Sequence, residues 1–515
     1  MPNGAECLLK TLVACGVDVC FANPGTSEMH FVAALDRAPG MRPVLGLFEG
    51  AVTGMADGYG RMAERPAATL LHLGPGLANG LANLHNARRA NTPIVNIVGD
   101  HATSHVQYDA PLASDIVGFA RPVSGWVHSC PSALAIAADT ARAVAAACEP
   151  PGQVATLILP ADVAWNEAGG PAPALAPLRQ ANVSDAAIEG AAQALRSGRR
   201  CAILMRGAAL KEEGLTLAGR IRSATGAVLL SDTFAPRTQR GAGRVPVEPL
   251  PYFAEHIVNR LAEIDHLILV GAKPPVSFFA YPDKPSWCVP AATQIHLLSH
   301  PHEDGVAALS ELAGRLAAPS AADVAVFQPP DQPSGKFNQY TIGAVIARHL
   351  PEGAIISEEA ATNAAGPAAA TRTAAPHDYL MLTGGAIGQG VPVATGAAIA
   401  RPASRVVCLQ GDGGGMYTLQ ALWTQARENL DVTTIIFANR SYAILNVELG
   451  RVGAGGAGPN AFSMLDLHNP ELDWVKLAEG MGVEASRATS ISEFEAQFID
   501  AIRQKGPRLI EAVLG

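Results

Sequence analysis

Short hydrophobic runs alternate with amphipathic segments along most of the chain. The runs are rich in Val, Ile and Leu and are bounded by polar or glycine residues, as strands of buried parallel sheets are. Between them, apolar residues recur at helical spacing, for example at residues 416, 419, 422 and 426. This alternation predicts an α/β protein with mainly parallel sheets flanked by helices. We expect strands at residues 17–21, 44–48, 68–73, 94–98, 155–159, 201–205, 227–231, 266–270, 294–298, 405–410 and 432–438, and near residues 354 and 508.

Two stretches rich in Pro, Ala and Gly interrupt the alternation, at residues 166–183 and 317–334. Such a composition is typical of linkers between domains. A chain of 515 residues is also long enough for about three domains of ordinary size. We therefore predict three domains, at residues 1–165, 183–316 and 335–515.

A glycine-rich turn with one carboxylate, Gly411-Asp412-Gly413, follows the predicted strand at residues 405–410, and the next strand ends at Asn439. The C-terminal ends of neighbouring parallel strands meet at one sheet edge, so Asp412 and Asn439 are expected to lie close together. Their oxygens suit Mg²⁺, and the free N–H groups of the turn suit a diphosphate. The turn alone is also typical of an ordinary strand-to-helix connection, and it is the paired Asn439 that favours the metal site.

A second carboxylate, Glu49, closes a hydrophobic run directly before a predicted helix. That helix carries Gly50, Gly54 and Gly58 at intervals of four residues, which leaves one face without side chains and lets another backbone pack closely. An acid at this position also fits a plainer role, in which it meets the positive end of the helix dipole.

Composition and charge exclude several classes of protein. With 49% hydrophobic and 16% charged residues, the chain fits a compact enzyme rather than a disordered or coiled protein. The net charge of −9 and the lack of a basic run argue against nucleic acid as a main partner. The eight cysteines include no C-x-x-C pair, so neither a zinc site nor a disulfide framework is indicated. No apolar stretch is long enough to span a membrane and no signal peptide is visible, so we expect a cytoplasmic protein without a membrane partner.

Together these motifs resemble the two signatures of thiamine-diphosphate enzymes of the 2-oxo acid decarboxylase and acetolactate synthase superfamily, and are closest to benzoylformate decarboxylase-like members. The matching segments are Glu49-Gly50, residues 56–59, and Gly411-Asp412-Gly413 with Asn439. The resemblance implies a pyrimidine-binding, a central Rossmann-like and a diphosphate-binding domain, with thiamine diphosphate and Mg²⁺ as cofactors. In that superfamily the pyrimidine and diphosphate domains of one site come from different chains, which implies a homodimer or homotetramer.

The resemblance also implies which residues hold the cofactors. Glu49 would hydrogen-bond the aminopyrimidine ring and promote removal of the C2 proton of the thiazolium. The metal ligands would be Asp412, Asn439 and the backbone carbonyl of Ser441, and the residues around the cofactor would include Gly411, Gly413, Gly414 and Tyr417.

Two further segments resemble parts of the cofactor site. The loop at residues 384–392 matches a family loop whose bulky apolar residue wedges between the two cofactor rings, a role that falls on Ile387. A plain core position is the alternative for this residue. The pair Glu358-Glu359 resembles an acidic segment that meets the cofactor. We take Glu358 as the cofactor contact, although the sequence leaves open which glutamate faces inward and whether both are solvated.

Residues 71–80 follow a strand and open a helix, so they mimic a dinucleotide-binding fingerprint. We reject NAD because Pro75 lies inside the G-x-G-x-x-x-G spacing and no acidic residue ends a following strand. The segment instead resembles the loop over the thiazolium, with Asn79 as a cofactor contact. His72 matches a histidine of benzoylformate decarboxylases and, because histidine titrates near neutrality, would exchange protons with the reacting carbon. A histidine that is only hydrogen-bonded within the loop is the alternative.

Residues 23–28 resemble the benzoylformate decarboxylase segment whose hydroxyl residue contacts the substrate carboxylate. By position this catalytic role falls on Thr26, with Ser27 adjacent. Either hydroxyl would also serve as the N-cap of a helix.

The chain departs from each subfamily at some point. Residues 274–281 offer aromatic side chains where benzoylformate decarboxylase has a central histidine, and Ala113-Ser114 stand where pyruvate decarboxylases have paired histidines. Residues 442–448 replace the tryptophan-bearing segment of acetolactate synthase, and nothing marks an FAD site.

We therefore expect non-oxidative decarboxylation of a small 2-oxo acid, with release of an aldehyde or ligation of the product carbon to an aldehyde or a second oxo acid. An acetolactate synthase-like carboligase and a non-catalytic thiamine-diphosphate-binding relative are the alternatives. Residues 447–458 include five glycines, so we also predict a mobile lid in which Arg451 recognises an anionic group of the substrate. A disordered surface loop with a solvated arginine is the alternative.

Overall fold

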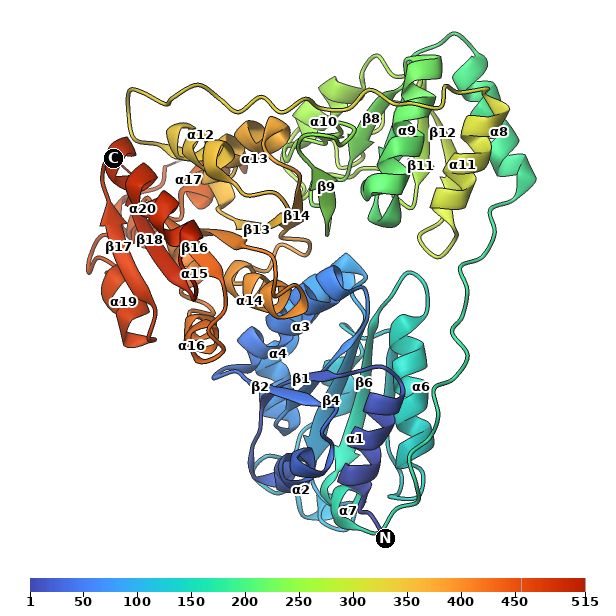
Figure 1. The fold of residues 1–515 in the computed structure, drawn as a ribbon, viewed down its shortest axis with the longest axis vertical. Coiled ribbons are helices and arrows are strands. Elements are labelled where there is room, and N and C mark those ends of the chain that lie inside the picture. Colours follow the sequence, from blue (N-terminus) through green and yellow to red (C-terminus); the bar gives the residue numbers. More distant parts are fainter. Residues whose placement is uncertain (455, 515) are drawn as a thin grey trace.

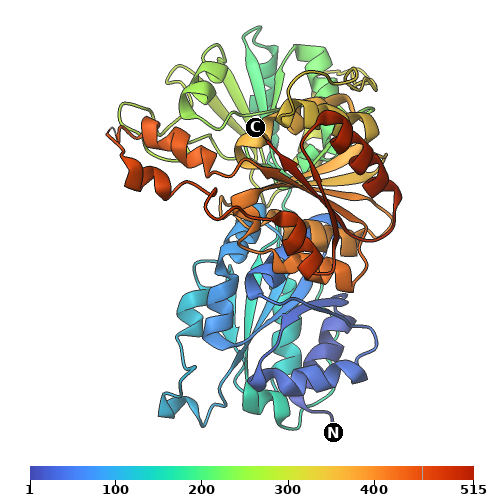
Figure 2. The same cartoon turned by 90° about the vertical axis from the view of Figure 1, so that its left-hand side faces the viewer.

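The computed structural model confirms the predicted α/β class. It describes residues 1–454 and 456–514, which form three sheets of mainly parallel strands flanked by helices. In Figure 1 the first sheet lies in the lower lobe, and the second and third sheets lie in the upper right and upper left lobes. Figure 2 shows the same N-terminal lobe beneath the other two.

The first sheet has the strand order β2-β1-β3-β4-β6-β5, and all its strands are parallel. The strands are β1 (Val19–Asn23), β2 (Arg42–Leu45), β3 (Ala67–Leu71), β4 (Ile94–Asp100), β5 (Trp126–Ser129) and β6 (Val154–Pro160). The helices are α1 (Gly4–Ala14), α2 (Met29–Ala34), α3 (Glu49–Ala63), α4 (Leu73–Ala90), α5 (Ile116–Ala120), α6 (Ile136–Cys148) and α7 (Ala161–Trp165). The central strands are buried on both faces, which explains their near-continuous apolar sequences.

The second sheet is also parallel, with the order β10-β8-β7-β11-β12. Its strands are β7 (Cys201–Met205), β8 (Val228–Ser231), β10 (Glu248–Pro249), β11 (His266–Val270) and β12 (Gln294–Ser299). The helices are α8 (Asp185–Arg196), α9 (Glu212–Thr225), α10 (Ala254–Leu261) and α11 (Gly305–Arg315).

The third sheet has the order β17-β18-β16-β15-β13-β14-β9. Its strands are β9 (Thr238–Arg240), β13 (Ala354–Glu359), β14 (His377–Met381), β15 (Val406–Gly411), β16 (Val432–Ala438), β17 (Glu484–Ala488) and β18 (Arg508–Val513). The helices are α12 (Gln339–His349), α13 (Ala365–Ala370), α14 (Gly390–Ala400), α15 (Asp412–Gly415), α16 (Gln420–Arg427), α17 (Ala443–Arg451), α18 (Pro459–Ser463), α19 (Trp474–Gly480) and α20 (Ile491–Arg503).

One strand of the third sheet comes from the predicted central segment. β9 pairs antiparallel with β14, and the guanidinium of Arg240 lies 4.7 Å from the ring centre of Tyr379. An exposed sheet edge would be a template for unwanted pairing, and β9 covers it. The composition that predicted a central domain at residues 183–316 gave no sign that one of its strands would join the sheet of the next domain.

Two local predictions also differ from the structure. The strand expected at residues 44–48 ends at Leu45, and the following residues lead directly into α3. The glycine-rich segment expected as a plain turn forms one helical turn, α15, and its glycines let neighbouring side chains approach the backbone closely.

The N-terminal and C-terminal lobes meet where α3 packs against α14. A Cβ atom at Gly58 would lie 2.1 Å from the carbonyl oxygen of Val393, and one at Gly396 would lie 1.9 Å from that of Met55. The smooth helix face predicted from the glycine spacing is therefore real, and it allows backbone-to-backbone contact between lobes. Figure 1 shows α3 and α14 side by side where these two lobes meet.

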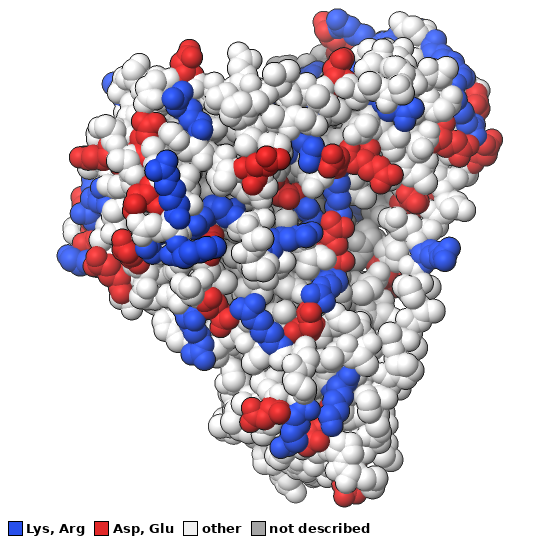
Figure 3. Space-filling view, viewed as in Figure 1, with Lys and Arg blue, Asp and Glu red and all other residues white. Residues whose placement is uncertain are grey.

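The surface carries mixed charge. In the face shown in Figure 3, Lys and Arg side chains alternate with Asp and Glu side chains and gather where the lobes meet. None of the described helices is both long and apolar enough to cross a membrane.

Candidate functional site

The N-terminal half of the candidate site is built around the start of α3. Glu49 is the first residue of that helix, and its side chain is turned inward, with the residue only 6% exposed. The side-chain amide of Asn79, on α4, donates a 3.0 Å hydrogen bond to Oε2 of Glu49. Oε1 lies 3.1 Å from the position that a Cβ at Gly76 would take, so the glycine leaves room beside the carboxylate. The predicted residues Glu49 and Asn79 are thus in contact.

His72 also lies near Gly76, where a Cβ would be 3.3 Å from the Cβ of His72. A buried acid, Glu28, orients its ring. Nδ1 of His72 lies 2.7 Å from Oε2 of Glu28, which is 1% exposed. Because a carboxylate only accepts hydrogen bonds, Nδ1 carries the hydrogen and Nε2 is left for other partners. The backbone N–H of Gly25 donates to Glu28 at 2.8 Å, and the hydroxyl of Ser27 donates at 2.9 Å.

Sequence reasoning missed Glu28. The signal was present, since the acid stands directly after the two hydroxyl residues in the segment that resembles a substrate-binding loop. The structure also separates those hydroxyls: Ser27 Oγ lies 3.3 Å from His72 Nδ1, whereas Thr26 is exposed. Neither is an N-cap, because the short helix that contains them, Thr26–Glu28, is preceded by Gly25. The structure therefore places Ser27, and not Thr26, beside His72.

The C-terminal half of the site lies at the ends of β15 and β16. These strands are paired in parallel with Gly411 opposite Phe437, so Asp412 and Asn439 follow at the same sheet edge. Asp412 is 4% exposed, and its two oxygens accept hydrogen bonds from the backbone of Gly413 at 2.9 Å and Arg440 at 2.6 Å. Burial raises the pKa of Asp412, with the backbone hydrogen bonds acting in the opposite direction.

The backbone around these residues forms a narrow cradle. The amide oxygen of Asn439 accepts a 3.1 Å hydrogen bond from the backbone of Ser441. A Cβ at Gly413 would lie 2.5 Å from the ring of Tyr442, and one at Gly414 would lie 2.6 Å from Oε1 of Glu359, whereas Gly411 has more space. At Gly413 and Gly414, therefore, close neighbours leave no room for a side chain.

The loop before α14 carries Ile387 between the two halves. Ile387 is only half-buried and belongs to none of the hydrophobic cores among the described residues, so the plain core interpretation is not supported. Tyr417, which is 53% exposed, lies beside the same loop, where a Cβ at Gly388 would be 2.6 Å from its own Cβ. The amide of Asn83 donates to the carbonyls of Gly50 at 2.7 Å and Gly388 at 3.3 Å. One side chain thus links the start of α3 to this loop.

The structure resolves which of the adjacent glutamates faces the loop, and it corrects our prediction. Glu359 accepts hydrogen bonds from the backbone of Gly388 and Gly390, whereas Glu358 lies on the opposite face of β13, toward Tyr379. Successive side chains of a strand point to opposite faces, so only one of the two can face α14. Both are buried, so the solvated alternative is also wrong.

Comparison with known proteins identifies the family. Protein-family models for the thiamine pyrophosphate enzyme N-terminal TPP binding domain and C-terminal TPP binding domain match residues 2–119 and 362–512. The chain belongs to the thiamine pyrophosphate enzyme family. The family resemblance expected from the motifs is confirmed.

Individual relatives of this TPP enzyme carry different names. A Mycobacterium tuberculosis protein provisionally named acetolactate synthase large subunit IlvX is 52% identical over 514 residues, or 99% of each chain. Benzoylformate decarboxylase of Pseudomonas aeruginosa is 29% identical over 96% of each chain. The structure of the thiamine diphosphate-dependent 4-hydroxybenzoylformate decarboxylase of Rhodococcus jostii RHA1 has a TM-score of 0.87 and 23% identity, covers 100% of this chain and 99% of its own, and shows the shared fold.

The residues of this TPP enzyme fit both cofactor groups. Glu49 and Asp412 are buried carboxylates whose contacts are amides rather than cations. Asp412 with the carbonyl oxygens of Asn439 and Ser441 forms an all-oxygen donor set, as Mg²⁺ prefers. The candidate magnesium ligands are thus one side-chain carboxylate and two carbonyl oxygens. Among the described residues, no group of three His, Cys, Asp or Glu side chains could hold a metal.

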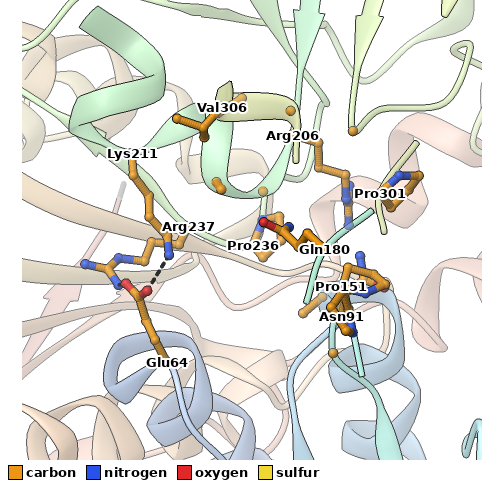
Figure 4. Close-up of a pocket in the computed structure, with 18 of the residues that line it drawn as sticks. Glu64, Asn91, Pro151, Gln180, Arg206, Lys211, Pro236, Arg237, Pro301 and Val306 are labelled. Carbon is orange, nitrogen blue, oxygen red and sulfur yellow. Dashed lines mark hydrogen bonds and ion pairs between the residues drawn. The ribbon is translucent and has the colours of Figure 1, made fainter. Parts of the chain in front are cut away.

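A cavity of about 460 Å³ lies apart from the candidate site, between the N-terminal and central lobes (Figure 4). Its charges are paired: Glu64, which follows α3, contacts Lys211 at 2.7 Å and Arg237 at 2.9 Å. None of the predicted site residues lines this cavity. Its ion pairs join the lobes rather than mark a second charged ligand site.

The predicted lid residue Arg451 has a different environment from the one expected. Its guanidinium makes a two-pronged ion pair with Glu255, at 2.7 and 2.9 Å, and lies 3.9 Å from the ring centre of Phe253. The structure therefore ties the end of α17 to α10 of the central lobe, and neither a solvated nor a substrate-facing arginine is seen. Gly455, part of the predicted lid, lies outside the described residues.

Proposed function

We propose that this TPP enzyme catalyses the thiamine diphosphate- and Mg²⁺-dependent, non-oxidative decarboxylation of a small 2-oxo acid, with release of an aldehyde or ligation of the product carbon to a second carbonyl compound. The observation that carries the proposal is the Glu28–His72–Ser27 cluster beside Glu49. A proton-transferring imidazole and a hydroxyl that can contact a substrate carboxylate are the groups that such a reaction needs.

The cofactors would be held by residues from both ends of the chain. Asp412, Asn439 and the Ser441 carbonyl would bind Mg²⁺ on the diphosphate, and Glu49 would accept a hydrogen bond from the aminopyrimidine ring. When bound, thiamine diphosphate supplies the electron sink that makes loss of CO₂ possible. The protein residues bind, orient and control protons.

His72 would be the proton donor and acceptor at the reacting carbon. Glu28 holds the hydrogen on Nδ1, so Nε2 is the nitrogen available for proton transfer. The Ser27 hydroxyl lies within reach of the same imidazole, and it would turn its one hydrogen from Glu28 to the carboxylate of the 2-oxo acid.

Carboligation is the second candidate, and it is favoured by the 52% identity to the Mycobacterium tuberculosis protein named as an acetolactate synthase subunit. The two outcomes differ only in whether the acyl carbon takes a proton or attacks an acceptor. Incubation with pyruvate, or with a 2-oxo acid plus an aldehyde, followed by product analysis separates them. A non-catalytic relative is the less favoured alternative, because both the acid Glu49 and the proton-transfer pair are present.

We also propose a homodimer or homotetramer. Large apolar side chains are exposed next to candidate site residues: Leu47 at 44%, Met29 at 46% and Tyr417 at 53%. A second copy of the chain would cover such side chains and complete the site from its other half. Light scattering with size-exclusion chromatography measures the oligomeric state, and a monomer at working concentration would contradict this proposal.

A screen of 2-oxo acids for CO₂ release, with thiamine diphosphate and Mg²⁺ added, tests the proposed function. Glu49→Gln is the matched control, because it keeps the shape of the side chain and removes its charge. We expect this variant to bind the cofactor and to turn over about 10²-fold more slowly, the scale of lost acid–base catalysis. Turnover within a few-fold of the wild type would remove Glu49 from the mechanism.

A further inference from the structure

The carboxylate of Glu359 accepts hydrogen bonds from the backbone on both sides of Gln389. It closes β13, is 3% exposed, and its two oxygens accept hydrogen bonds from the N–H groups of Gly388 at 2.7 Å and Gly390 at 2.5 Å. The side-chain amide of Gln410 donates to the same carboxylate at 3.2 Å. All three contacts are with uncharged donors, and none is with a cation. The buried carboxylate is therefore stabilised by these N–H groups.

Residues of the N-terminal lobe also form hydrogen bonds with the loop that Glu359 holds. Asn86, on α4, donates to the carbonyl of Ala386 at 2.8 Å and accepts from its N–H at 3.3 Å. His85 contacts the carbonyl of Gly384 at 3.1 Å. Ile387 therefore stands between an anchor from α4 at residue 386 and an anchor from β13 at residue 388.

The backbone of this loop has little freedom to shift. Gly388 has a φ of +94°, which side chains other than glycine rarely adopt, and a Cβ at Gly390 would lie 2.3 Å from Oε1 of Gln410. A carboxylate that accepts from two N–H groups in nearly successive residues fixes the orientation of the peptide units between them. The direction in which Ile387 points is thus set by its two neighbours.

We propose that Glu359 is a positioning residue that holds the 384–390 loop so that Ile387 keeps a bound thiamine diphosphate in its reactive bent shape. This inference rests on the proposed function, because it assigns Ile387 to the cofactor. The plainer role for Glu359 is an acid at the N-terminus of α14, which stabilises the helix through its dipole. A role in the helix alone would change stability and leave the chemistry of the bound cofactor unchanged.

Glu359→Gln tests the proposal without changing the size of the side chain. An amide has one acceptor oxygen, so its NH₂ group must face one of the two backbone N–H donors, and one anchor is lost. The readout is the rate at which the C2 proton of bound thiamine diphosphate exchanges with deuterium, measured by NMR after acid quench without any substrate. This rate reports the shape of the cofactor rather than turnover.

We expect the exchange rate to fall about tenfold or more in Glu359→Gln, as small misplacements of reacting groups do. Glu358→Gln is the matched control, since it removes the adjacent buried carboxylate from the opposite face of the same strand, and it should leave exchange within about twofold of the wild type. An equal exchange rate in Glu359→Gln and the wild type, with cofactor bound in both, overturns the inference.

A second variant keeps the test open if Glu359→Gln does not fold. Asn86→Ala removes the anchor from α4 and leaves the N-terminus of α14 intact, so slowed exchange with an unchanged melting temperature supports positioning, and unchanged exchange contradicts it. A wild-type chain that binds no thiamine diphosphate overturns the proposed function itself. The failure of the loop assignment is a different result: the cofactor binds, and the exchange rate of the folded variant equals that of the wild type.

Discussion

Replacing Glu28 with Gln changes one property of the site, the negative charge behind His72. Oε2 of Glu28 accepts from both Gly25 and His72, and Oε1 accepts from the Ser27 hydroxyl. The glutamine oxygen can keep the first two contacts while its NH₂ group donates to Ser27, because a hydroxyl also accepts. The geometry therefore survives and the charge does not.

The size of the effect follows from the hydrogen bond that joins Glu28 to His72, which is 2.7 Å long. A hydrogen bond to a charged group contributes about 1.5–3 kcal/mol, against about 1 kcal/mol for a neutral one. The difference, about 0.5–2 kcal/mol in stabilising the protonated imidazole, corresponds to a loss of roughly 2- to 30-fold in kcat/KM. Glu28→Ala removes the partner altogether and is expected to cost about 10²-fold.

The assay is steady-state CO₂ release with the best 2-oxo acid, together with the affinity for thiamine diphosphate. Asp139→Asn is the matched control, because Asp139 is a similarly buried acid that contacts His128 at 2.9 Å in the same lobe. We expect the control to keep wild-type kinetics. If both variants lower kcat/KM equally, or if Glu28→Gln has no effect, then Glu28 does not act through His72.

Three further outcomes are expected. Asp412→Ala should weaken thiamine diphosphate binding at least tenfold and make it depend on excess Mg²⁺, because the metal on the diphosphate loses a protein ligand. Calorimetry with and without EDTA measures the affinity, and equal affinities in the variant and the wild type would refute the metal site. Burial raises the pKa of Glu358 from 4.5 to about 7, so the folded protein keeps this proton while the unfolded chain loses it, and the free energy of unfolding falls as the pH rises from about 4.5 to 7. At about 1.4 kcal/mol for each pKa unit, Glu358→Gln should raise the free energy of unfolding by at most about 3 kcal/mol at pH 8 and by little at pH 4.5. The urea midpoint should therefore rise only at the higher pH, and an equal rise at both pH values would contradict this prediction. Glu255→Gln should speed tryptic cleavage after Arg451 several-fold, because it breaks the ion pair between α17 and α10. The control Glu248→Gln breaks an ion pair within the central lobe and should leave the cleavage rate unchanged. Equal cleavage rates in both variants would show that the Arg451–Glu255 pair does not hold α17.

Local sequence pattern determined the parts of the site that depend on one β-α-β unit. Asp412 and Asn439 were predictable together because adjacent parallel strands end at one sheet edge, and the register of β15 and β16 places them there. Glu49 was predictable because a single acid ends an apolar run before a helix with a smooth glycine face. The α/β class followed in the same way from runs that are buried on both faces.

Only the tertiary structure decided which of several suitable side chains meet. Glu28 acts on His72 across a separation of 44 residues, and Glu359 rather than Glu358 faces the loop of Ile387 because of the strand pleat. The pair of Arg451 with Glu255 and the exchange of β9 into the third sheet join segments from different domains. Hydrophobic periodicity fixes which face of an element is buried, but the partner of a charged or edge group depends on how separate elements pack, and no local pattern encodes that.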